Sequence, residues 1–288
     1  MTLPTSEASE ASEASETAQA RPPAGDIPVL MLHGFLGCKD DWHTVASTLQ
    51  SGRRVAVFDL PGHGPAADAR EDADCSMDSA CHRIEAVLEA LESTSGHIIG
   101  YSMGARIALY FAVTRPGCIA SLILESGSAG IEDEAARARR RLDDETRAAK
   151  LSREGLESFV AAWEQHPLFA SQSSLSDKVR ADQRARRLAG DAEALARSIR
   201  HAGTGAQHWL GDHLVKITAP VLLIAGSLDE TYVEIARAMQ PRFPHAHLKI
   251  VEGAGHNVHL EKPDEYLAIV DEFLSHHGAH THHHNHGE

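Results

Sequence analysis

Short apolar runs alternate with helical patterns along most of this chain. The apolar runs lack a polar face, as expected for strands that are buried on both sides of a sheet. They occupy residues 27–32, 54–58, 97–99, 121–125, 221–225 and 247–251. Between them, segments such as residues 77–91 carry apolar side chains three or four positions apart, which predicts helices with one buried face. The alternation predicts an α/β fold, with a mostly parallel sheet flanked by helices.

The alternation stops between residues 129 and 212, where no strand-like run occurs. This segment predicts a helical cap, inserted into a core of residues 26–128 and 213–275. The cap would cover the carboxyl edge of the sheet, where open α/β sheets bind ligands. Residues 130–212 hold 12 Arg and 2 Lys against 14 acidic residues, so the cap is nearly neutral in an acidic chain. We expect most of these arginines to be solvated, while a few that face inward would suit an anionic substrate.

Both ends of the chain predict disordered tails. Residues 1–25 repeat Ser, Glu and Ala, and such a composition buries too little apolar surface to offset the entropy of ordering. Residues 276–288 contain seven histidines at irregular spacing. A flexible His-rich tail can bind divalent metal without specificity, and we assign it no catalytic role.

Composition excludes several classes of function. A net charge of −14 argues against nucleic-acid binding, because phosphates would be repelled. No apolar run is long enough to span a bilayer, so we expect no membrane insertion. The N-terminus lacks a basic and then apolar signal segment, and the four cysteines lack zinc-like spacing. These features predict a reduced, cytoplasmic protein.

The pentapeptide Gly100-Tyr101-Ser102-Met103-Gly104 carries the clearest chemical signal. An apolar strand-like run precedes it and a helix-like run follows, which is the context of the nucleophile elbow in an α/β-hydrolase fold. Glycines are needed there because strand and helix cross closely around a strained serine. A G-x-S-x-G could also occur by chance, but its two flanks favour the elbow.

The residues Ser102, Asp229 and His256 follow one another in the order that an α/β-hydrolase triad requires. Asp229 is the last residue of a Gly-Ser-Leu-Asp turn that follows the strand-like run 221–225. His256 lies in a glycine-rich turn after the last strand. Glu125 is a rival acid, because it also ends a strand. Other histidines could in principle act as the base, namely His33, His63 and His259.

The loop His33-Gly34-Phe35-Leu36-Gly37 follows the first strand-like run. In this fold that loop supplies one N–H of the oxyanion hole, and the residue after the nucleophile supplies the other. We therefore expect Phe35 and Met103 to donate these two backbone hydrogen bonds. A simple glycine turn is the alternative for the loop taken alone.

The chain resembles the 2-succinyl-6-hydroxy-2,4-cyclohexadiene-1-carboxylate synthases, menaquinone-biosynthesis enzymes of the α/β-hydrolase superfamily. The resemblance covers residues 27–274. Its generic parts are the loop at Phe35, the turn Asp59-Leu60-Pro61-Gly62-His63-Gly64 and the elbow. Its specific parts are Tyr101 and Arg106 around the nucleophile, Arg140-Arg141, the segment Trp163-Glu164-Gln165-His166-Pro167-Leu168-Phe169, Arg184, and Gly253-Ala254-Gly255-His256-Asn257. One departure is Ala105, where a second glycine is usual.

This resemblance implies that Arg106, Arg140 and Arg184 bind substrate carboxylates. Tyr101 and Trp163 would shape the site. A slip of one helical position would change which cap arginine faces the substrate, because other arginines lie next to Arg140 and Arg184.

The resemblance also implies a lyase that eliminates pyruvate from a small anionic substrate, with an activated serine as general base. No metal or organic cofactor is implied. The alternative is a serine esterase, thioesterase or C–C bond hydrolase that acts through an acyl-enzyme.

Overall fold

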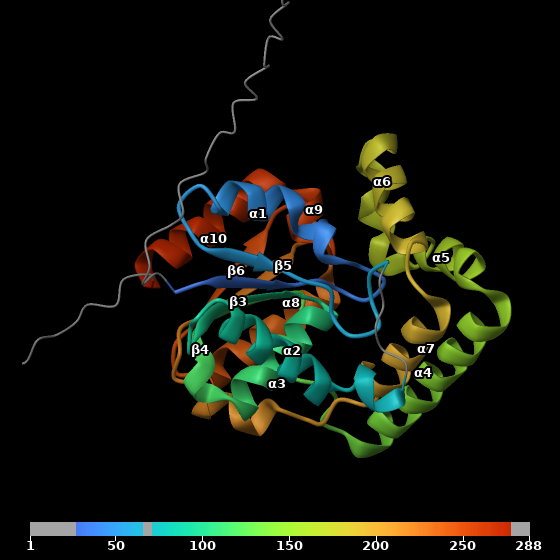
Figure 1. The fold of residues 1–288 in the computed structure, drawn as a ribbon, viewed down its shortest axis with the longest axis horizontal. Coiled ribbons are helices and arrows are strands. Elements are labelled where there is room, and N and C mark those ends of the chain that lie inside the picture. Colours follow the sequence, from blue (N-terminus) through green and yellow to red (C-terminus); the bar gives the residue numbers. More distant parts are fainter. Residues whose placement is uncertain (1–26, 66–70, 278–288) are drawn as a thin grey trace, which may run out of the picture.

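The central sheet has six parallel strands in the order β2-β1-β3-β4-β5-β6 (Figure 1). The computed structural model describes residues 27–65 and 71–277, so the predicted tail of residues 1–25 lies outside it. The strands are β1 (Val29–Leu32), β2 (Val55–Val57), β3 (Gly96–Tyr101), β4 (Ile119–Glu125), β5 (Val221–Gly226) and β6 (Ala246–Val251). Successive side chains of each inner strand are buried on opposite faces of the sheet, which explains the continuous apolar runs.

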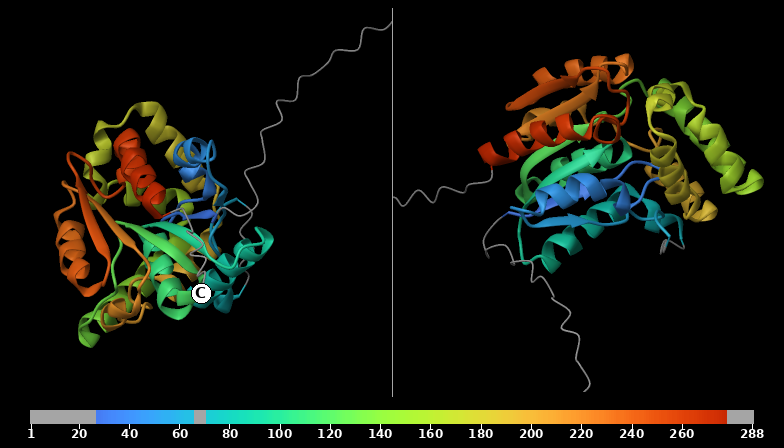
Figure 2. Two further views of the ribbon diagram at one scale, coloured as in Figure 1. Left: turned by 90° about the vertical axis from the view of Figure 1, so that its left-hand side faces the viewer. Right: turned by 90° about the horizontal axis from the view of Figure 1, so that it is seen from above.

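Helices cover both faces of the sheet (Figures 1 and 2). The helices that pack with Val29 and Met31 are α1 (His43–Leu49), α9 (Val258–Glu261) and α10 (Pro263–His277). Those that pack with Leu30 and Leu32 are α2 (Met77–Ala90), α3 (Met103–Thr114) and α8 (Glu230–Met239). Short 3₁₀ turns occur at Lys39–Trp42, Asp72–Cys75, Pro116–Cys118, Pro167–Ser174, Gly211–Lys216 and Gln240–Arg242. The predicted α/β-hydrolase fold is thus confirmed, and every pairing in the described sheet is parallel.

Helix α10 extends further than the sequence pattern predicted. Residues His276 and His277 form its last turn, so the predicted tail of residues 276–288 begins two residues too early. The His277 ring packs edge-to-face on Phe273 at 4.7 Å between centroids, which gives this last turn an apolar contact. The remaining residues of that tail, 278–288, lie outside the described residues.

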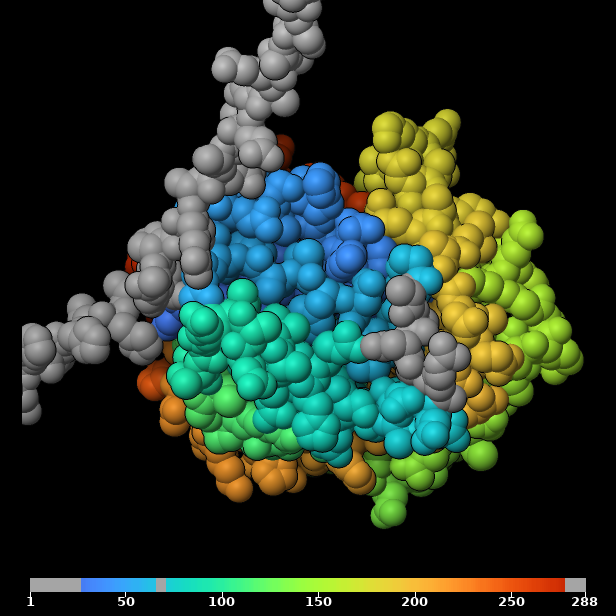
Figure 3. All heavy atoms as spheres, viewed as in Figure 1, coloured from blue at the N-terminus to red at the C-terminus, as the bar shows by residue number. Residues whose placement is uncertain are grey.

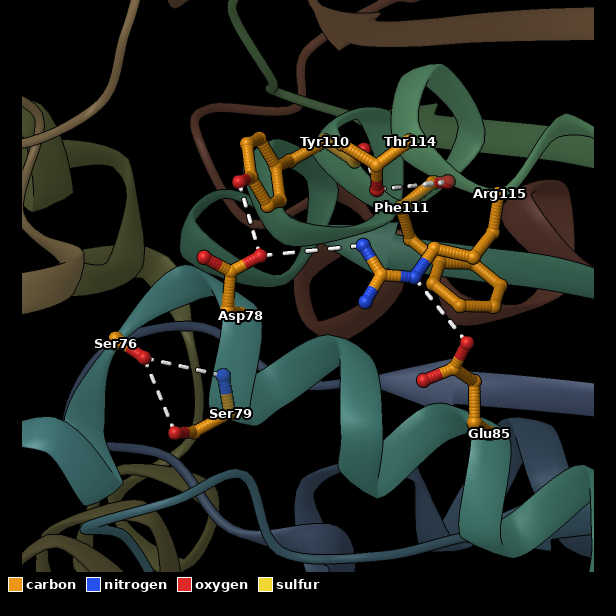
Figure 4. Close-up of polar contacts among 8 residues, drawn as sticks. All are labelled: Ser76, Asp78, Ser79, Glu85, Tyr110, Phe111, Thr114 and Arg115. Carbon is orange, nitrogen blue, oxygen red and sulfur yellow. Dashed lines mark hydrogen bonds and ion pairs between the residues drawn. The ribbon is translucent and has the colours of Figure 1, made fainter.

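Helices α2 and α3 are joined by polar contacts on the outer surface of the core (Figure 4). Arg115 reaches Glu85 at 3.2 Å and Asp78 at 3.9 Å, and the Tyr110 hydroxyl donates to Asp78 at 3.0 Å. Exposed ion pairs contribute little to stability. The buried core already holds these two helices together. The polar contacts therefore mainly help to fix how α2 and α3 are aligned with each other.

Four helices between β4 and β5 lie together at the carboxyl ends of the strands (Figures 1 and 2). They are α4 (Glu134–Glu154), α5 (Leu156–Glu164), α6 (Asp177–Leu188) and α7 (Ala192–Ala202). We refer to residues 129–212 as the cap. The cap has an apolar cluster of its own, which includes Leu151, Val160 and Leu195 and receives Leu36 from the core. Its two ends meet where the Leu210 N–H donates to the Ala129 carbonyl at 2.8 Å.

Helix α6 projects from the body of the molecule (Figure 3). An ion pair holds this helix to the core. Arg186 Nε lies 2.7 Å from Asp41 Oδ1, and both side chains are about three-quarters buried. Asp41 also accepts the backbone N–H of Cys38 at 3.0 Å. This contact fixes α6 against the loop that follows β1.

Strand β3 and helix α3 cross closely, with glycine at both positions 100 and 104. A Cβ at Gly100 would overlap the carbonyl of Gly104, and a Cβ at Gly104 would overlap the carbonyls of Leu32 and His33. The methyl group of Ala105 faces Gly127, where a further Cβ would lie only 2.7 Å from it. Glycine at 127 therefore makes room for the alanine that departs from the family pattern.

We expect Gly104→Ala to lower the free energy of unfolding by about 3 kcal/mol, because the added methyl has to displace backbone of β1. Chemical denaturation monitored by circular dichroism measures this change. Gly117→Ala is the matched control, since its Cβ would meet no atom within 4 Å, and it should change stability by less than about 0.5 kcal/mol. Equal effects of the two substitutions would contradict the close crossing.

Candidate active site

Ser102 occupies a strained backbone conformation between β3 and α3. Its φ is +52° and its ψ is −107°, a backbone conformation that residues other than glycine rarely adopt. The Ser102 N–H donates to the Glu125 carbonyl at 2.9 Å, so the neighbouring strand β4 holds the turn. The Ser102 carbonyl accepts the Arg106 N–H at 3.1 Å and begins α3. This backbone geometry is the one expected of a nucleophile elbow, and Ser102 remains the predicted nucleophile.

The structure brings Ser102, His256 and Asp229 into one hydrogen-bonded chain. His256 Nε2 lies 3.0 Å from Ser102 Oγ, and His256 Nδ1 lies 2.7 Å from Asp229 Oδ2. His256 and Asp229 are buried. With the Nδ1 proton donated to Asp229, Nε2 is free to accept the serine proton, as general-base activation requires.

The acid and the base are held from separate elements at the carboxyl edge of the sheet. Asp229 caps α8, where its Oδ1 accepts the Tyr232 N–H at 3.3 Å. The Ser126 hydroxyl donates to the carbonyl of His256 at 2.8 Å. A Cβ at Gly226 would overlap the carbonyls of residues 254 and 255, so the end of β5 passes directly under the histidine loop. These contacts orient the imidazole between its two partners.

The rival acid and a rival base form a second buried pair. His259 Nδ1 lies 2.7 Å from Glu125 Oε2, and the His259 N–H donates to Glu125 Oε1 at 3.1 Å. Both residues are buried, and the Trp42 ring stacks on the His259 imidazole at 4.1 Å. Each rival residue is therefore engaged away from Ser102, and the geometry favours Asp229 and His256 for the triad.

His33 and His63 shape the loops after β1 and β2. His33 Nε2 accepts the Leu60 N–H at 3.0 Å, while Nδ1 donates to the Gly34 carbonyl at 2.8 Å. His63 Nδ1 donates to the Pro61 carbonyl at 3.1 Å, and burial lowers the pKa of His63 to about 3. A histidine that stays neutral and bonded to its own loop has a structural role.

The two predicted oxyanion donors come from separate elements of the core. Phe35 is in the loop after β1, and Met103 is the first residue of α3. Among the described residues, neither backbone N–H has a hydrogen-bond partner. The Phe35 ring packs edge-to-face on Trp163 of the cap at 5.3 Å. Both amides thus remain available to an anionic oxygen.

Arg106 is a buried cation without an acidic partner. Its guanidinium donates from Nη1 to the Ala202 carbonyl at 3.0 Å and to Gln207 Oε1 at 3.2 Å. No carboxylate lies within ion-pair distance of Arg106 in the part of the chain that the structure describes. Burial lowers the pKa of Arg106 to about 10, and the charge of Arg140 contributes to the lowering. The group is still charged near neutral pH.

The other residues implied by the resemblance lie around this centre. Arg140 donates from Nε to Asp144 at 2.7 Å within α4. The Tyr101 ring is tilted against His256 at 5.5 Å and covers Gly34, where a Cβ would lie 2.7 Å from its edge. Burial raises the pKa of Tyr101 well above its usual value, so its hydroxyl stays neutral.

Trp163 belongs to a group of aromatic rings that links the cap to His256. Its ring lies 5.4 Å from Phe169, and Phe169 packs edge-to-face on His256 at 5.9 Å. The sequence motif that contains Phe169 gives no sign of this contact. The contact with His256 makes Phe169 part of the wall of the site.

Arg187, a neighbour of the predicted Arg184 on α6, is the more buried of two arginines that pair with Glu164. Arg184 pairs with Glu164 at 2.6 Å, and its side chain is 35% exposed. Arg187 pairs with the other oxygen of Glu164 at 3.1 Å, is 9% exposed and lies 6.0 Å from the centre of the Phe169 ring. The helical rotation of α6 therefore turns Arg187 toward Phe169, and Arg187 joins Arg184 as a candidate substrate-binding residue.

A family model for the alpha/beta hydrolase fold matches residues 27–263. A Bacillus subtilis protein, provisionally named a 2-succinyl-6-hydroxy-2,4-cyclohexadiene-1-carboxylate synthase, is 36% identical over 86% of this chain and 90% of its own length. The Serratia proteamaculans synthase of the same name is 31% identical over 85% of this chain and 92% of its own length. The chain belongs to this synthase family of α/β hydrolases.

A solved structure of the synthase family is also similar to this chain. MenH from S. aureus superimposes with a TM-score of 0.84 at 35% identity, over 88% of this chain and 95% of the other. An esterase from Thermogutta terrifontis superimposes with a TM-score of 0.75 at 24% identity, which shows the shared fold alone. The predicted family is thus confirmed.

The remaining sequence predictions concern membrane insertion, metal binding and cellular location. No described helix is long and apolar enough to cross a membrane. Within residues 27–65 and 71–277, no cluster of three His, Cys, Asp or Glu side chains could hold a metal ion. Metal binding by the C-terminal tail and a cytoplasmic location remain predictions.

We expect His256→Ala to slow labelling of Ser102 by a fluorophosphonate at least about 100-fold, because the general base is lost. His259→Ala should change the labelling rate by less than about threefold. It should instead lower the free energy of unfolding by about 3–5 kcal/mol, since the buried Glu125 carboxylate loses its partner. Mass spectrometry follows the labelling, and denaturation measures stability. The reverse pattern would mean that His259 is the base.

Proposed function

We propose that this chain eliminates pyruvate from 2-succinyl-5-enolpyruvyl-6-hydroxy-3-cyclohexene-1-carboxylate. The product is 2-succinyl-6-hydroxy-2,4-cyclohexadiene-1-carboxylate, an intermediate of menaquinone biosynthesis. Relatives with this named activity cover most of the chain at 30% identity or more, which supports a lyase of this family. The substrate is small and carries several carboxylates.

The observation that carries the proposal is the buried charge of Arg106. A buried cation is costly unless an anion or hydrogen-bond acceptors compensate it, and here the acceptors are two neutral oxygens. Arg106 lies one helical turn after Ser102, so an anion bound to it would lie beside the nucleophile. An ordinary neutral ester would leave this charge uncompensated. A substrate carboxylate would compensate it.

In this reaction Ser102 acts as a base toward carbon. His256 accepts the Ser102 proton, and the serine oxygen removes a proton from the substrate ring. The electrons of that C–H bond delocalise onto the succinyl ketone oxygen, where the N–H groups of Phe35 and Met103 can stabilise the negative charge. As the new ring double bond forms, the C–O bond to the enolpyruvyl group breaks. The released enolpyruvate takes up a proton and becomes pyruvate.

The substrate would be bound from three directions around the triad. Arg106 approaches from α3, Arg140 from α4 and Arg187 from α6. Guanidinium groups suit carboxylates because their donors form a planar fork. Trp163 and Tyr101 would cover the faces of the ring. No cofactor is needed, because the reaction is a proton transfer coupled to loss of a leaving group.

Pyruvate release from the enolpyruvyl substrate, measured with coupled lactate dehydrogenase, tests the proposal directly. We expect rapid release by the wild type and a loss of about 1000-fold in Ser102→Ala, since general-base catalysis contributes a factor of this size. Hydrolysis of a p-nitrophenyl ester is measured in parallel. Ester hydrolysis without pyruvate, or a covalent acyl-enzyme that accumulates with the true substrate, would favour the hydrolase alternative.

Removal of the buried cation should affect the anionic substrate selectively. We expect Arg106→Ala to lower kcat/KM for pyruvate release by about 10- to 150-fold, which corresponds to the loss of about 1.5–3 kcal/mol of charge-assisted bonding. The same variant should hydrolyse a neutral ester nearly as well as the wild type. Equal losses on both substrates would argue against carboxylate binding by Arg106.

The two arginines that share Glu164 provide a matched comparison. We expect Arg187→Ala to lower kcat/KM for pyruvate release at least about tenfold, since a charge-assisted bond to the substrate is lost. Arg184→Ala should change it by less than about twofold, because this side chain lies on the exposed side of the pair. Steady-state kinetics of both variants decides between them. A larger effect at residue 184 would assign carboxylate binding to Arg184.

A further inference from the structure

Tyr232 lies beside the triad and has no part in the reaction as described above. Its ring packs edge-to-face on the His256 imidazole, with the ring centres 4.6 Å apart. Its backbone N–H donates to Asp229 Oδ1 at 3.3 Å in the first turn of α8. These two contacts hold the side chain next to both the acid and the base.

The Tyr232 hydroxyl is an unused donor at this position. Among the described residues it has no hydrogen-bond partner, and its oxygen is not sealed from solvent. Burial raises the pKa of Tyr232, so the hydroxyl keeps its proton near neutral pH. The positive charge of Arg106 lowers this pKa, the negative charge of Asp229 raises it, and the positive charge of Arg140 lowers it. On the geometry, Tyr232 packs on His256, which binds Ser102, and Arg106 follows Ser102 by one turn of α3.

Arg106 leaves room for a second donor to the anion that it binds. Its Nη1 is already engaged by the Ala202 carbonyl and by Gln207, so only its remaining N–H groups can reach a substrate. A carboxylate accepts about four hydrogen bonds through its two oxygens. A neutral hydroxyl beside Arg106 can satisfy one of these acceptor sites without adding charge to a region that already holds two cations.

We propose that Tyr232 donates a hydrogen bond to the substrate carboxylate that Arg106 binds, and thereby contributes to substrate affinity. This inference rests on the proposed function, because that substrate supplies the carboxylate. Tyr232 is then a substrate-binding residue whose ring also packs against the base. The hydroxyl and the ring make separable contributions, since the first touches substrate and the second touches His256.

Substitution by phenylalanine removes the hydroxyl and keeps the ring on His256. We expect Tyr232→Phe to raise KM for pyruvate release about tenfold and to leave kcat within about twofold, because a bond made equally in the ground state and the transition state affects KM alone. Tyr110→Phe is the control, since its hydroxyl binds Asp78 on the outer surface (Figure 4) and its loss should change neither constant. In Arg106→Ala, the added Tyr232→Phe substitution should cost less than in the wild type, because both groups hold one carboxylate.

A second measurement separates this inference from the proposed function. Calorimetry with 4-oxo-4-phenylbutanoate, a γ-keto carboxylate, measures carboxylate binding without the elimination reaction. If the wild type released no pyruvate, the proposed function would fail, and about tenfold weaker binding of this acid by Tyr232→Phe would still support the role of the hydroxyl. Equal KM and equal affinity in wild type and Tyr232→Phe would overturn the inference. Loss of kcat in Tyr232→Leu alone would then assign Tyr232 to ring packing.

Discussion

The backbone of Ser102 is the constraint on which the site depends. Its positive φ is held by the hydrogen bond from its N–H to Glu125 and by the close crossing of β3 and α3 at Gly100 and Gly104. This turn raises the serine oxygen above the carboxyl edge of the sheet. It also starts α3 at the next residue, so that the Met103 amide and the Arg106 side chain face the same region.

The parallel topology brings the remaining catalytic groups to that edge. Strands β3, β5 and β6 all end there, which lets Asp229 and His256 reach Ser102 from loops far apart in the sequence. The cap then determines what kind of ligand the site accepts. Ala202 and Gln207 offer Arg106 only neutral oxygen acceptors, while Phe169 packs against His256. A triad common to many hydrolases is thus surrounded by groups suited to an anion.

Two acid–histidine pairs lie within this small region, and they differ in what they contact. The pair of Asp229 and His256 ends at the serine oxygen. The pair of Glu125 and His259 lies under Trp42 and behind Tyr101, where it supports the wall of the site. In the sequence, both acids lie at or just after strand ends, and the two histidines lie three residues apart after the last strand. Their separation follows from burial and from the direction of each imidazole, which spacing along the chain does not encode.

The sequence by itself determined the fold, the elbow and the order of the triad, because these depend on local patterns. Apolar runs, helical spacing and two glycines around a serine report directly on strands, helices and a tight turn. The side chains that face the substrate from the cap were decided by tertiary structure. Arg186 and Arg187 are consecutive residues of α6 and point in different directions around its axis. Arg186 pairs with Asp41 of the core, whereas Arg187 lies beside Phe169. Likewise, Tyr232 becomes part of the site only because α8 packs under the histidine loop. Such choices depend on the rotation and docking of whole helices, and the linear sequence carries only a weak signal for either.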